Sequence, residues 1–354
     1  MRTPTRRAVL GAGIAAAGSG LLAACSSEPA GNGDAYVSPG GAEVAAAEAE
    51  RHAGPVRSVR LTATPARLDL GGGLTVASWA YGDRLPGQQV RVTAGDTLAL
   101  TLANHLPEPT SVHWHGLALR NDMDGAPGLT QPAIKPGASF DYRFAVGRPG
   151  TYWLHPHSGT QQDRGLYAPL IVEDPKEPLA YDREWVVVLD DWVDGVEGST
   201  PDAVLAELSR GMGDMGGMHH GDHGGHDMSG MSGMTMSAPA PSGPSRMLMG
   251  ATSPFLGGDA GDVAYPHYLV NGRVPEDPET FTARPGDRIR VRLVNAGGDT
   301  AFRVALGGHR MTVTHTDGFP VEHTGTDSVL LGMGERYDVL IEAKDGVFPL
   351  TALA

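Results

Sequence analysis

The amino-acid sequence predicts an all-β protein with two antiparallel sandwich or barrel domains. Glycine (50) and proline (27) are abundant among the 354 residues and aromatic residues make up only 6%, a composition typical of chains with many turns. Short alternating segments separated by turn residues recur along the chain, as they do in sandwiches and barrels. Two long stretches also resemble each other, which indicates a duplicated domain.

Residues 1–24 are predicted to be an export leader that takes no part in the fold. Segment 5–10 (TRRAVL) resembles the twin-arginine export motif, and segment 22–25 (LAAC) resembles a lipobox, whose cysteine is lipidated. We expect a twin-arginine-exported lipoprotein, anchored through Cys25 on the outer face of the cytoplasmic membrane. The alternative is a plain signal peptide with an incidental cysteine. No later apolar run is long enough to span a bilayer.

Cysteine content and charge exclude several classes of protein. Cys25 is the only cysteine, and its lipidation would leave no free thiol. That excludes disulfides, zinc–thiolate sites and a blue-copper site, whose copper needs a cysteine ligand. The net charge is −14, and removing the leader, with three arginines and no acidic residue, makes it −17 (−14 − 3). We expect no nucleic-acid partner for so acidic a chain.

The first predicted domain spans residues 56–174 and follows a flexible tether at 25–55. The tether is rich in Gly, Ala, Glu and Pro, with one short helix expected at 42–51. Turns containing glycine or proline separate the strands of the domain. The predicted strands are 59–63, 74–79, 89–93, 97–104, 110–119, 139–145, 150–155 and 167–173.

The second predicted domain spans residues 178–354, after a linker at 174–178. Its first strand, 184–192 (EWVVVLDDW), is a continuous apolar run typical of a buried strand. Thr200 and Pro201 predict the start of a helix that ends near Arg210. The later predicted strands are 268–271, 279–283, 288–295, 301–306, 310–316, 327–331 and 336–342.

Residues 211–245 form an insert rich in methionine, histidine and small residues. Such a composition cannot bury a core, so we expect the insert to be disordered without a ligand. Thioethers favour Cu(I) and imidazoles accept Cu(I) or Cu(II), which predicts copper binding; a neutral linker and an unrelated histidine-rich tract are the alternatives. The candidate ligands are Met212, Met215, Met218, His219, His220, His223, His226, Met228, Met231, Met234 and Met236.

Two histidine doublets, His113-Trp114-His115 and His155-Pro156-His157, are the strongest functional signal. Side chains alternate faces along a strand, so both histidines of a doublet would point the same way. Two such strands side by side would aim four imidazoles at one place. Neutral imidazole suits copper, zinc, iron and nickel, and the lack of a thiolate or carboxylate within the doublets favours copper.

The internal repeat aligns 94–104 with 285–295 without gaps. In both stretches Gly-Asp precedes an alternating strand that ends in asparagine. Continuing this register places Val304 and Leu306 opposite the first histidine pair. With one deletion further on, Thr351 and Leu353 fall opposite the second pair. The second domain is therefore predicted to be a copy without ligands, and the chain ends inside this copy, so we expect a fragment of a longer protein.

The motifs resemble the N-terminal copper motifs of the multicopper oxidases. They are HWHG at 113–116, DGAPGLTQP at 124–132 and HPHSGTQ at 155–161. The resemblance covers about 56–354 and implies two cupredoxin-like Greek-key sandwich domains, with the family's third domain absent from the chain. The family's His-Cys-His motif, which holds the type 1 copper and part of a trinuclear cluster, is missing.

The resemblance also implies roles for individual residues. His113 would be a type 2 copper ligand, and His115, His155 and His157 would be type 3 ligands, together half of the trinuclear cluster. Asp124 falls where the family keeps an acidic residue that delivers protons to bound oxygen. Its simpler interpretation is a turn aspartate before glycine.

The implied function is an exported copper-dependent oxidoreductase that takes electrons from a substrate and reduces O2 to water. The insert resembles the methionine-rich insert of bacterial cuprous oxidases, which implies Cu(I) as the substrate and a role in copper tolerance. Phenol oxidation, as in laccases, is the close variant. Without a type 1 site the chain as given is expected to be inactive alone. The alternative function is a non-enzymatic lipoprotein that sequesters copper at the cell surface.

Overall fold

The computed structural model describes residues 41–51, 54–216, 243–248, 250–254, 256, 258 and 260–354. Residues Glu48–Ala354 form one compact unit that contains two β-sandwiches. Helix α2 (Ala42–Arg51) covers the residues for which the sequence predicts a short helix. Among the described residues, neither α2 nor α3 (Pro201–Gly216) is long and apolar enough to cross a bilayer.

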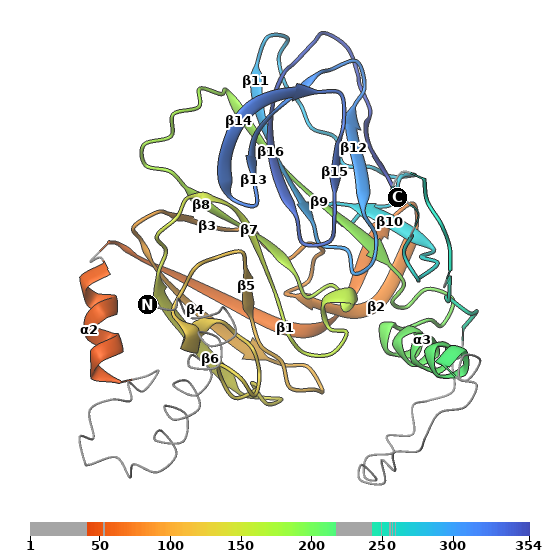
Figure 1. Cartoon of the computed structure of the whole chain (residues 1–354). Helices are drawn as coiled ribbons and strands as arrows, with labels where there is room; N and C mark the ends of the chain where they lie inside the picture. Colours follow the sequence, from red (N-terminus) through yellow and green to blue (C-terminus); the bar gives the residue numbers. More distant parts are fainter. Residues whose placement is uncertain are drawn as a thin grey trace, which may run out of the picture. The chain divides into compact units, whose positions relative to one another are not determined.

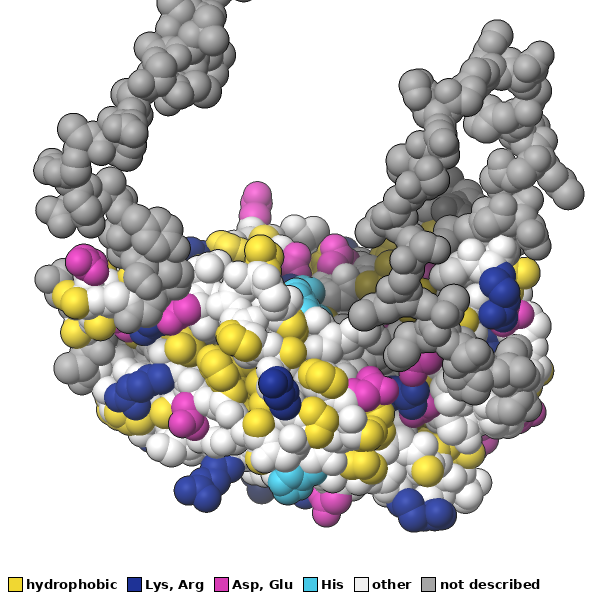
Figure 2. Space-filling view, turned by 90° about the horizontal axis from the view of Figure 1, so that it is seen from below, with side chains coloured by type: hydrophobic (Ala, Val, Ile, Leu, Met, Phe, Trp, Pro, Cys, Tyr) yellow, Lys and Arg dark blue, Asp and Glu magenta, His cyan; other side chains and the backbone are white. Residues whose placement is uncertain are grey.

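The first sandwich consists of sheets β2-β1-β4-β6 and β3-β8-β7-β5 (Figure 1). Alternating side chains from both sheets meet in a core that includes Leu100, Trp114 and Phe144. Figure 2 shows one outer face of the molecule, on which hydrophobic side chains are interspersed with charged ones. The elements are β1 (Val56–Gly71), β2 (Leu74–Tyr81), β3 (Val90–Thr93), β4 (Thr97–Asn104), β5 (His113–His115), η1 (Asn121–Met123), β6 (Ser139–Ala145), β7 (Gly150–His155), η2 (Gln162–Arg164) and β8 (Ala168–Glu173).

Strand β1 is much longer than predicted because it serves two partners in turn. Val56–Ala63 pairs in parallel with β4, and Ala63–Gly71 pairs antiparallel with β2. Pro65, which has no N–H to donate, comes just after the pairing with β4 ends. The later half of β1, with β2, packs against the second sandwich through Leu68, Leu70, Val76, Trp192 and Leu269.

The second sandwich consists of sheets β10-β9-β11-β16-β13-β14 and β15-β12-β17. β14 was not predicted, and the predicted strand at 279–283 is wrong. Residues 280–283 alternate between exposed and half-buried, but the segment pairs with no strand in the described part of the chain. The strands are β9 (Arg183–Trp192), β10 (His267–Val270), β11 (Arg288–Asn295), β12 (Phe302–Leu306), β13 (Met311–Thr316), β14 (Phe319–Thr326), β15 (Val329–Leu331), β16 (Arg336–Glu342) and β17 (Leu350–Leu353).

The two sandwiches share the same polar bonds at the aspartate of the Gly-Asp motif. Asp96 accepts hydrogen bonds from Arg57 Nε at 2.8 Å and from the backbone N–H three residues before it at 3.0 Å. Asp287 accepts the same pair of bonds, from Arg183 and from the N–H three residues before it. Each arginine comes from the strand that pairs in parallel with the strand after the aspartate.

The two repeat asparagines are equally alike. Asn104 and Asn295 are both fully buried. Each side-chain amide donates to two backbone carbonyls, at 2.8 and 2.8 Å for Asn104 and at 2.8 and 3.2 Å for Asn295. Each amide oxygen accepts the N–H two residues later, at 2.9 Å. The shared bonds show that the sequence repeat is a structural repeat.

Beyond the asparagines, the predicted register of the repeat is wrong. β5 pairs Trp114 with Leu154, and β12 pairs Val304 with Ala352. Trp114 and Val304 are each buried in the core of their own sandwich, so Val304 is the counterpart of Trp114 and not of His113. The loop after the asparagine is one residue shorter in the second sandwich, which a gap-free alignment cannot show.

The corrected register also changes the other counterparts. The counterparts of His113, His115 and His155 in the second sandwich are Arg303, Ala305 and Leu353. The sequence alignment had instead assigned Val304, Leu306 and Thr351 to these positions. None of these three offers an imidazole, thiolate or carboxylate.

Candidate metal centre

Strands β5 and β7 bring the histidine doublets together. The strands pair antiparallel, with His113 opposite His155 and His115 opposite Trp153. Between the histidines of β5, Trp114 points into the core and donates its Nε1 hydrogen to the Met123 carbonyl at 3.0 Å. The predicted strand 110–119 is too long, since the chain turns at Gly116 (φ +87°) directly after the doublet.

The second doublet is a strand only in its first half. β7 ends at His155, Pro156 is buried, and His157 follows outside the strand. The N–H of His157 donates to Ser111 Oγ at 3.1 Å, which holds its backbone beside the segment that precedes β5. His157 thus reaches the cluster from a loop and is the most exposed of its histidines.

All four imidazoles converge. His113, His155 and His157 each offer a ring nitrogen, and these nitrogens lie within 4.8 Å of one another. His115 joins them, with its Nδ1 3.3 Å from His155 Nε2. The rings of His113 and His157 stack at a centroid separation of 4.1 Å. The arrangement matches what the sequence predicts for two adjacent doublets.

Backbone carbonyls fix the tautomers of two histidines. His113 Nδ1 lies 2.9 Å from the Asp124 carbonyl, and His155 Nδ1 lies 3.1 Å from the Pro156 carbonyl. A carbonyl only accepts, so each Nδ1 carries the hydrogen and each Nε2 carries the lone pair that can bind a metal ion. Outer bonds of this kind orient imidazoles for metal binding.

The cluster favours neutral imidazoles. Burial, together with the neighbouring histidines, lowers the pKa of His155 to about 3. Burial and the nearby Arg336 lower the pKa of His115 to about 4. The pKa of His157 is also lowered, mainly by burial and less by His113, and Asp124 opposes this shift. Neutral imidazole is the form that binds a metal ion, so the site is ready for a cation at neutral pH.

Asp124 lies at the edge of this cluster. Its carboxylate Oδ1 is 3.3 Å from His113 Nδ1, and its side chain is about one-third exposed, at 35%. Its backbone N–H closes the short η1 turn through the Asn121 carbonyl, so it is also a turn aspartate before Gly125. The turn aspartate is thus observed, and the role of Asp124 in proton delivery stays a prediction.

Two parts of the site were not found from the sequence. Trp153 is buried and stacks on His155 at 4.3 Å and on His115 at 4.8 Å between ring centroids. It lies two residues before His155 on the same strand face, so the alternation could have found it. Arg336 comes from the second sandwich, and no local pattern marks it.

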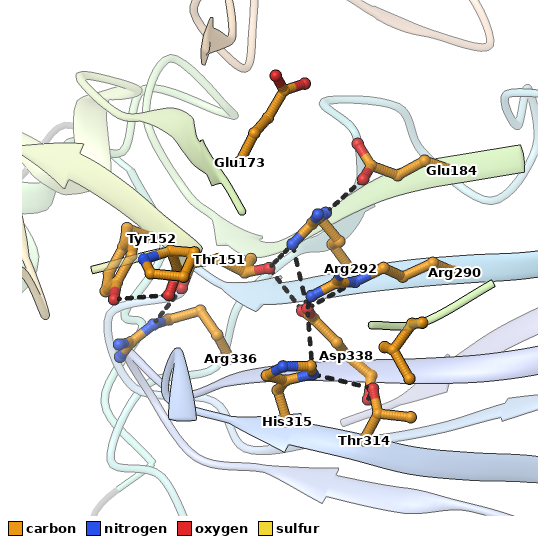
Figure 3. A network of polar contacts seen from close by, with 12 residues as sticks. Thr151, Tyr152, Glu173, Glu184, Arg290, Arg292, Thr314, His315, Arg336 and Asp338 are labelled. Carbon is orange, nitrogen blue, oxygen red and sulfur yellow. Dashed lines mark hydrogen bonds and ion pairs between the residues drawn. The ribbon is translucent and has the colours of Figure 1, made fainter. Parts of the chain in front are cut away.

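A buried polar network holds β7 to the second sandwich (Figure 3). Thr151 Oγ1 donates to Asp338 Oδ1 at 2.5 Å and accepts from Arg292 Nη1 at 2.9 Å. Arg290 also donates to Asp338, at 2.5 and 3.0 Å. Asp338 is 1% exposed, so its charge depends on the two arginines. The strand that carries His155 is therefore anchored by the domain without ligands.

The candidate ligands of the insert are mostly outside the described residues. Helix α3 extends to Gly216, so the prediction that disorder begins at residue 211 is wrong, and Met212 and Met215 lie on this helix. Where the description resumes, Arg246 N–H donates to Glu207 of α3 at 3.0 Å. Outside the described residues lie Met218, His219, His220, His223, His226, Met228, Met231, Met234 and Met236.

Known proteins match this chain along most of its length. Two profiles of the family described as multicopper oxidase match, over residues 62–177 and 229–353. Multicopper oxidase MmcO of Mycobacterium tuberculosis is 49% identical over 355 residues, covering 99% of this chain and 64% of the relative. Copper resistance protein A of Escherichia coli is 36% identical over 271 residues, covering 76% of this chain and 43% of that protein. The chain spans less than two-thirds of either relative.

Solved structures give the same result. The crystal structure of a multi-copper oxidase from Pseudomonas thermotolerans matches with a TM-score of 0.64 and 27% identity, covering 84% of this chain and 61% of that chain. The blue copper oxidase from Nitrosomonas europaea matches with a TM-score of 0.61 and 26% identity, covering 84% and 79%. The predicted fold class, all-β with cupredoxin-like sandwiches, is confirmed. The chain belongs to the multicopper oxidase family.

Proposed function

We propose that the protein is an exported copper-dependent oxidase that takes electrons one at a time from Cu(I) and reduces O2 to water, with a role in copper tolerance. The convergence of four imidazoles on β5 and at the end of β7 is the observation that carries this proposal. The similarity to a relative named for copper resistance supports Cu(I) as the substrate. A phenol is the alternative reductant.

The residues present fit copper. His113, His115, His155 and His157 would hold it, since imidazole suits copper and the Nε2 lone pairs of His113 and His155 would be available to a metal ion. Bound copper would supply one-electron redox chemistry to the site. The Asp124 carboxylate lies 3.3 Å from His113 Nδ1, and we propose that it delivers protons to the site. The Trp153 ring covers two of the imidazoles and keeps water from that side.

A second candidate function is copper sequestration without turnover. It is favoured by the single cysteine, because a type 1 copper needs a cysteine ligand and Cys25 is the predicted site of lipidation, outside both predicted domains. We therefore place electron entry outside residues 1–354 and propose that this chain alone takes up copper without consuming O2.

Oxygen uptake separates the two functions. The whole reading frame that contains these residues would be expressed, loaded with copper and supplied with Cu(I) in an oxygen electrode cell. The oxidase proposal expects one O2 consumed for every four Cu(I), because reduction of O2 to water takes four electrons. Bound copper with no O2 uptake from Cu(I) or from a phenol would establish sequestration instead.

We further propose twin-arginine export and a lipid anchor on Cys25, both from residues 1–25, which lie outside the described residues. Cys25→Ser should move the protein from the membrane fraction to the soluble fraction. Replacing both Arg6 and Arg7 with lysine should leave the protein inside the cell. An unchanged distribution of the Cys25→Ser protein would contradict the anchor.

A further inference from the structure

Arg336 of the second sandwich reaches the strand that carries His155. It begins β16, and it is only 4% exposed. Its Nε donates to the Thr151 carbonyl on β7 at 3.2 Å, and its Nη1 donates to the Gly334 carbonyl at 3.0 Å. Figure 3 shows the guanidinium beside Thr151 and Tyr152. One side chain therefore bonds β7 of the first sandwich and the turn that enters β16 of the second.

The same guanidinium packs against the other ligand strand. Gly116 follows His115 directly, and a Cβ at Gly116 would overlap Arg336 Nη2. The backbone of Gly116 also has a φ of +87°, which favours glycine. Glycine at the end of the HWHG motif thus leaves the space that the arginine fills. Arg336 contacts both β7 and the turn that closes β5.

The turn before Arg336 touches a candidate ligand itself. A Cβ at Gly334 would lie 2.7 Å from Cε1 of the His115 ring, so the ring rests on the backbone of this turn. Trp153 stacks on the same ring at 4.8 Å. Since Arg336 Nη1 bonds the Gly334 carbonyl, it also holds the surface on which the imidazole rests.

We propose that Arg336 is a positioning residue of the four-histidine copper site, which sets the orientation of His115 and the spacing of β5 and β7 from the neighbouring domain. The proposal rests on the proposed copper-binding function. Charge alone would act in the opposite direction, because a cation beside a copper site repels the metal. Asp317 Oδ1, 2.9 Å from Arg336 Nη1, offsets part of that repulsion. Loss of the guanidinium should therefore weaken copper binding if positioning dominates, and should strengthen copper binding if charge repulsion dominates.

The test is a copper titration of the full chain against a competing chelator, with the EPR spectrum of Cu(II) as a second readout. Arg336→Met keeps much of the volume but removes the charge and the donors. It should weaken copper binding at the four histidines by about 10- to 100-fold, the usual effect of losing a group that orients ligands, and should alter the EPR spectrum. Arg336→Lys keeps the charge without the fork of donors and should recover only part of the affinity.

Arg310→Met is the matched control, since Arg310 also donates to a backbone carbonyl of the second sandwich, that of Gly325 at 2.9 Å, but on the exposed side. It should leave both readouts unchanged. Unchanged or tighter binding by Arg336→Met would overturn the proposal, as would wild-type affinity and spectrum in Arg336→Lys. Thermal unfolding of the metal-free proteins checks the fold, and the Arg336→Lys result decides if Arg336→Met does not fold. A wild-type protein that binds no copper at the histidines would instead refute the underlying copper function.

Discussion

The two sandwiches share the same hydrogen-bonded turns, but they differ in the side chains at the positions of the histidine cluster. Both carry the bonded Gly-Asp turn and the buried asparagine, yet only in the first do four histidines converge, on β5 and at the end of β7. Within the described chain, β7 lies between β5 and β8 and is buried along its whole length, whereas β17 lies at a sheet edge and alternates in exposure. The comparison shows that a few polar residues at turns set the framework, and that the ligand positions vary independently of it.

A second difference lies on the strands that follow the matched glycines Gly137 and Gly334. Asp141 of β6 is exposed and accepts a bond from Thr101 at 2.6 Å. Asp338 of β16, its counterpart in the repeat, is buried and paired with arginines at the contact with β7. The second sandwich therefore uses this position to hold the domain that carries the histidine cluster.

The largest expected effect comes from removing the histidines that distinguish the sandwiches. The double change of His113→Ala and His155→Ala should abolish high-affinity copper binding in the first sandwich, a loss of more than about 100-fold, because half of the imidazoles are gone. Copper bound by the Met/His insert should remain. Titration with chelator competition measures both, and His323→Ala, on an exposed strand of the second sandwich, is the control. If both classes of copper disappear together, the two sites are not independent.

Next in size is the matched aspartate pair. Asp338→Ala removes the buried carboxylate that Arg290 and Arg292 share and leaves them only Glu177 and Glu184 as partners, so it should lower the free energy of unfolding by about 3 kcal/mol or more. Asp141→Ala, at the matching exposed position, should change it by less than about 0.5 kcal/mol. Urea unfolding of the metal-free chain gives both values. Equal effects would mean that the domain contact does not depend on Asp338.

The buried asparagines offer a test of the shared framework. Asn104→Ala and Asn295→Ala each leave two carbonyls and one N–H without partners, so each should lower the free energy of unfolding by about 3 kcal/mol. The two values should agree, because the bonds are the same in both sandwiches. Thermal unfolding of the two variants measures them side by side, and a clear inequality would show that the two frames contribute differently to stability.

The smallest expected effect depends on pH and lies where the sandwiches meet. Burial, reinforced by Asp191, Asp202 and Asp299, raises the pKa of Asp163 to about 7. The folded protein then holds a proton that the unfolded chain has already lost, so this group lowers stability as pH rises from about 4 to about 7. Asp163→Asn should therefore stabilise the protein at pH 8, on the order of 2 kcal/mol, and hardly at all at pH 4. Equal stabilisation at both pH values would rule out this titration.

Local patterns predicted the site better than they predicted the sheets. Alternation along HWH correctly predicted that both histidines of β5 point to one face of the strand and Trp114 to the other. The Gly-Asp motif identified the repeat. The length of β1 was missed because the strand pairs with two partners in turn, which no local pattern shows. Val304 was misplaced because the one-residue deletion lies in the loop before β12, and a one-residue shift moves every later side chain to the other face of the strand. Arg336 has no local signal at all, since its contacts with β5 and β7 exist only after the domains pack.

The hydrogen bond from Arg336 to the Thr151 carbonyl also has a consequence for the order in which the protein is made and folds. A ribosome makes β5 and β7 long before it makes β16, so the histidine strands leave it without the side chain that contacts both of them. Their final geometry waits for the later domain to be translated and to fold. Although the four histidines lie in the first sandwich, their final arrangement is a late product of synthesis.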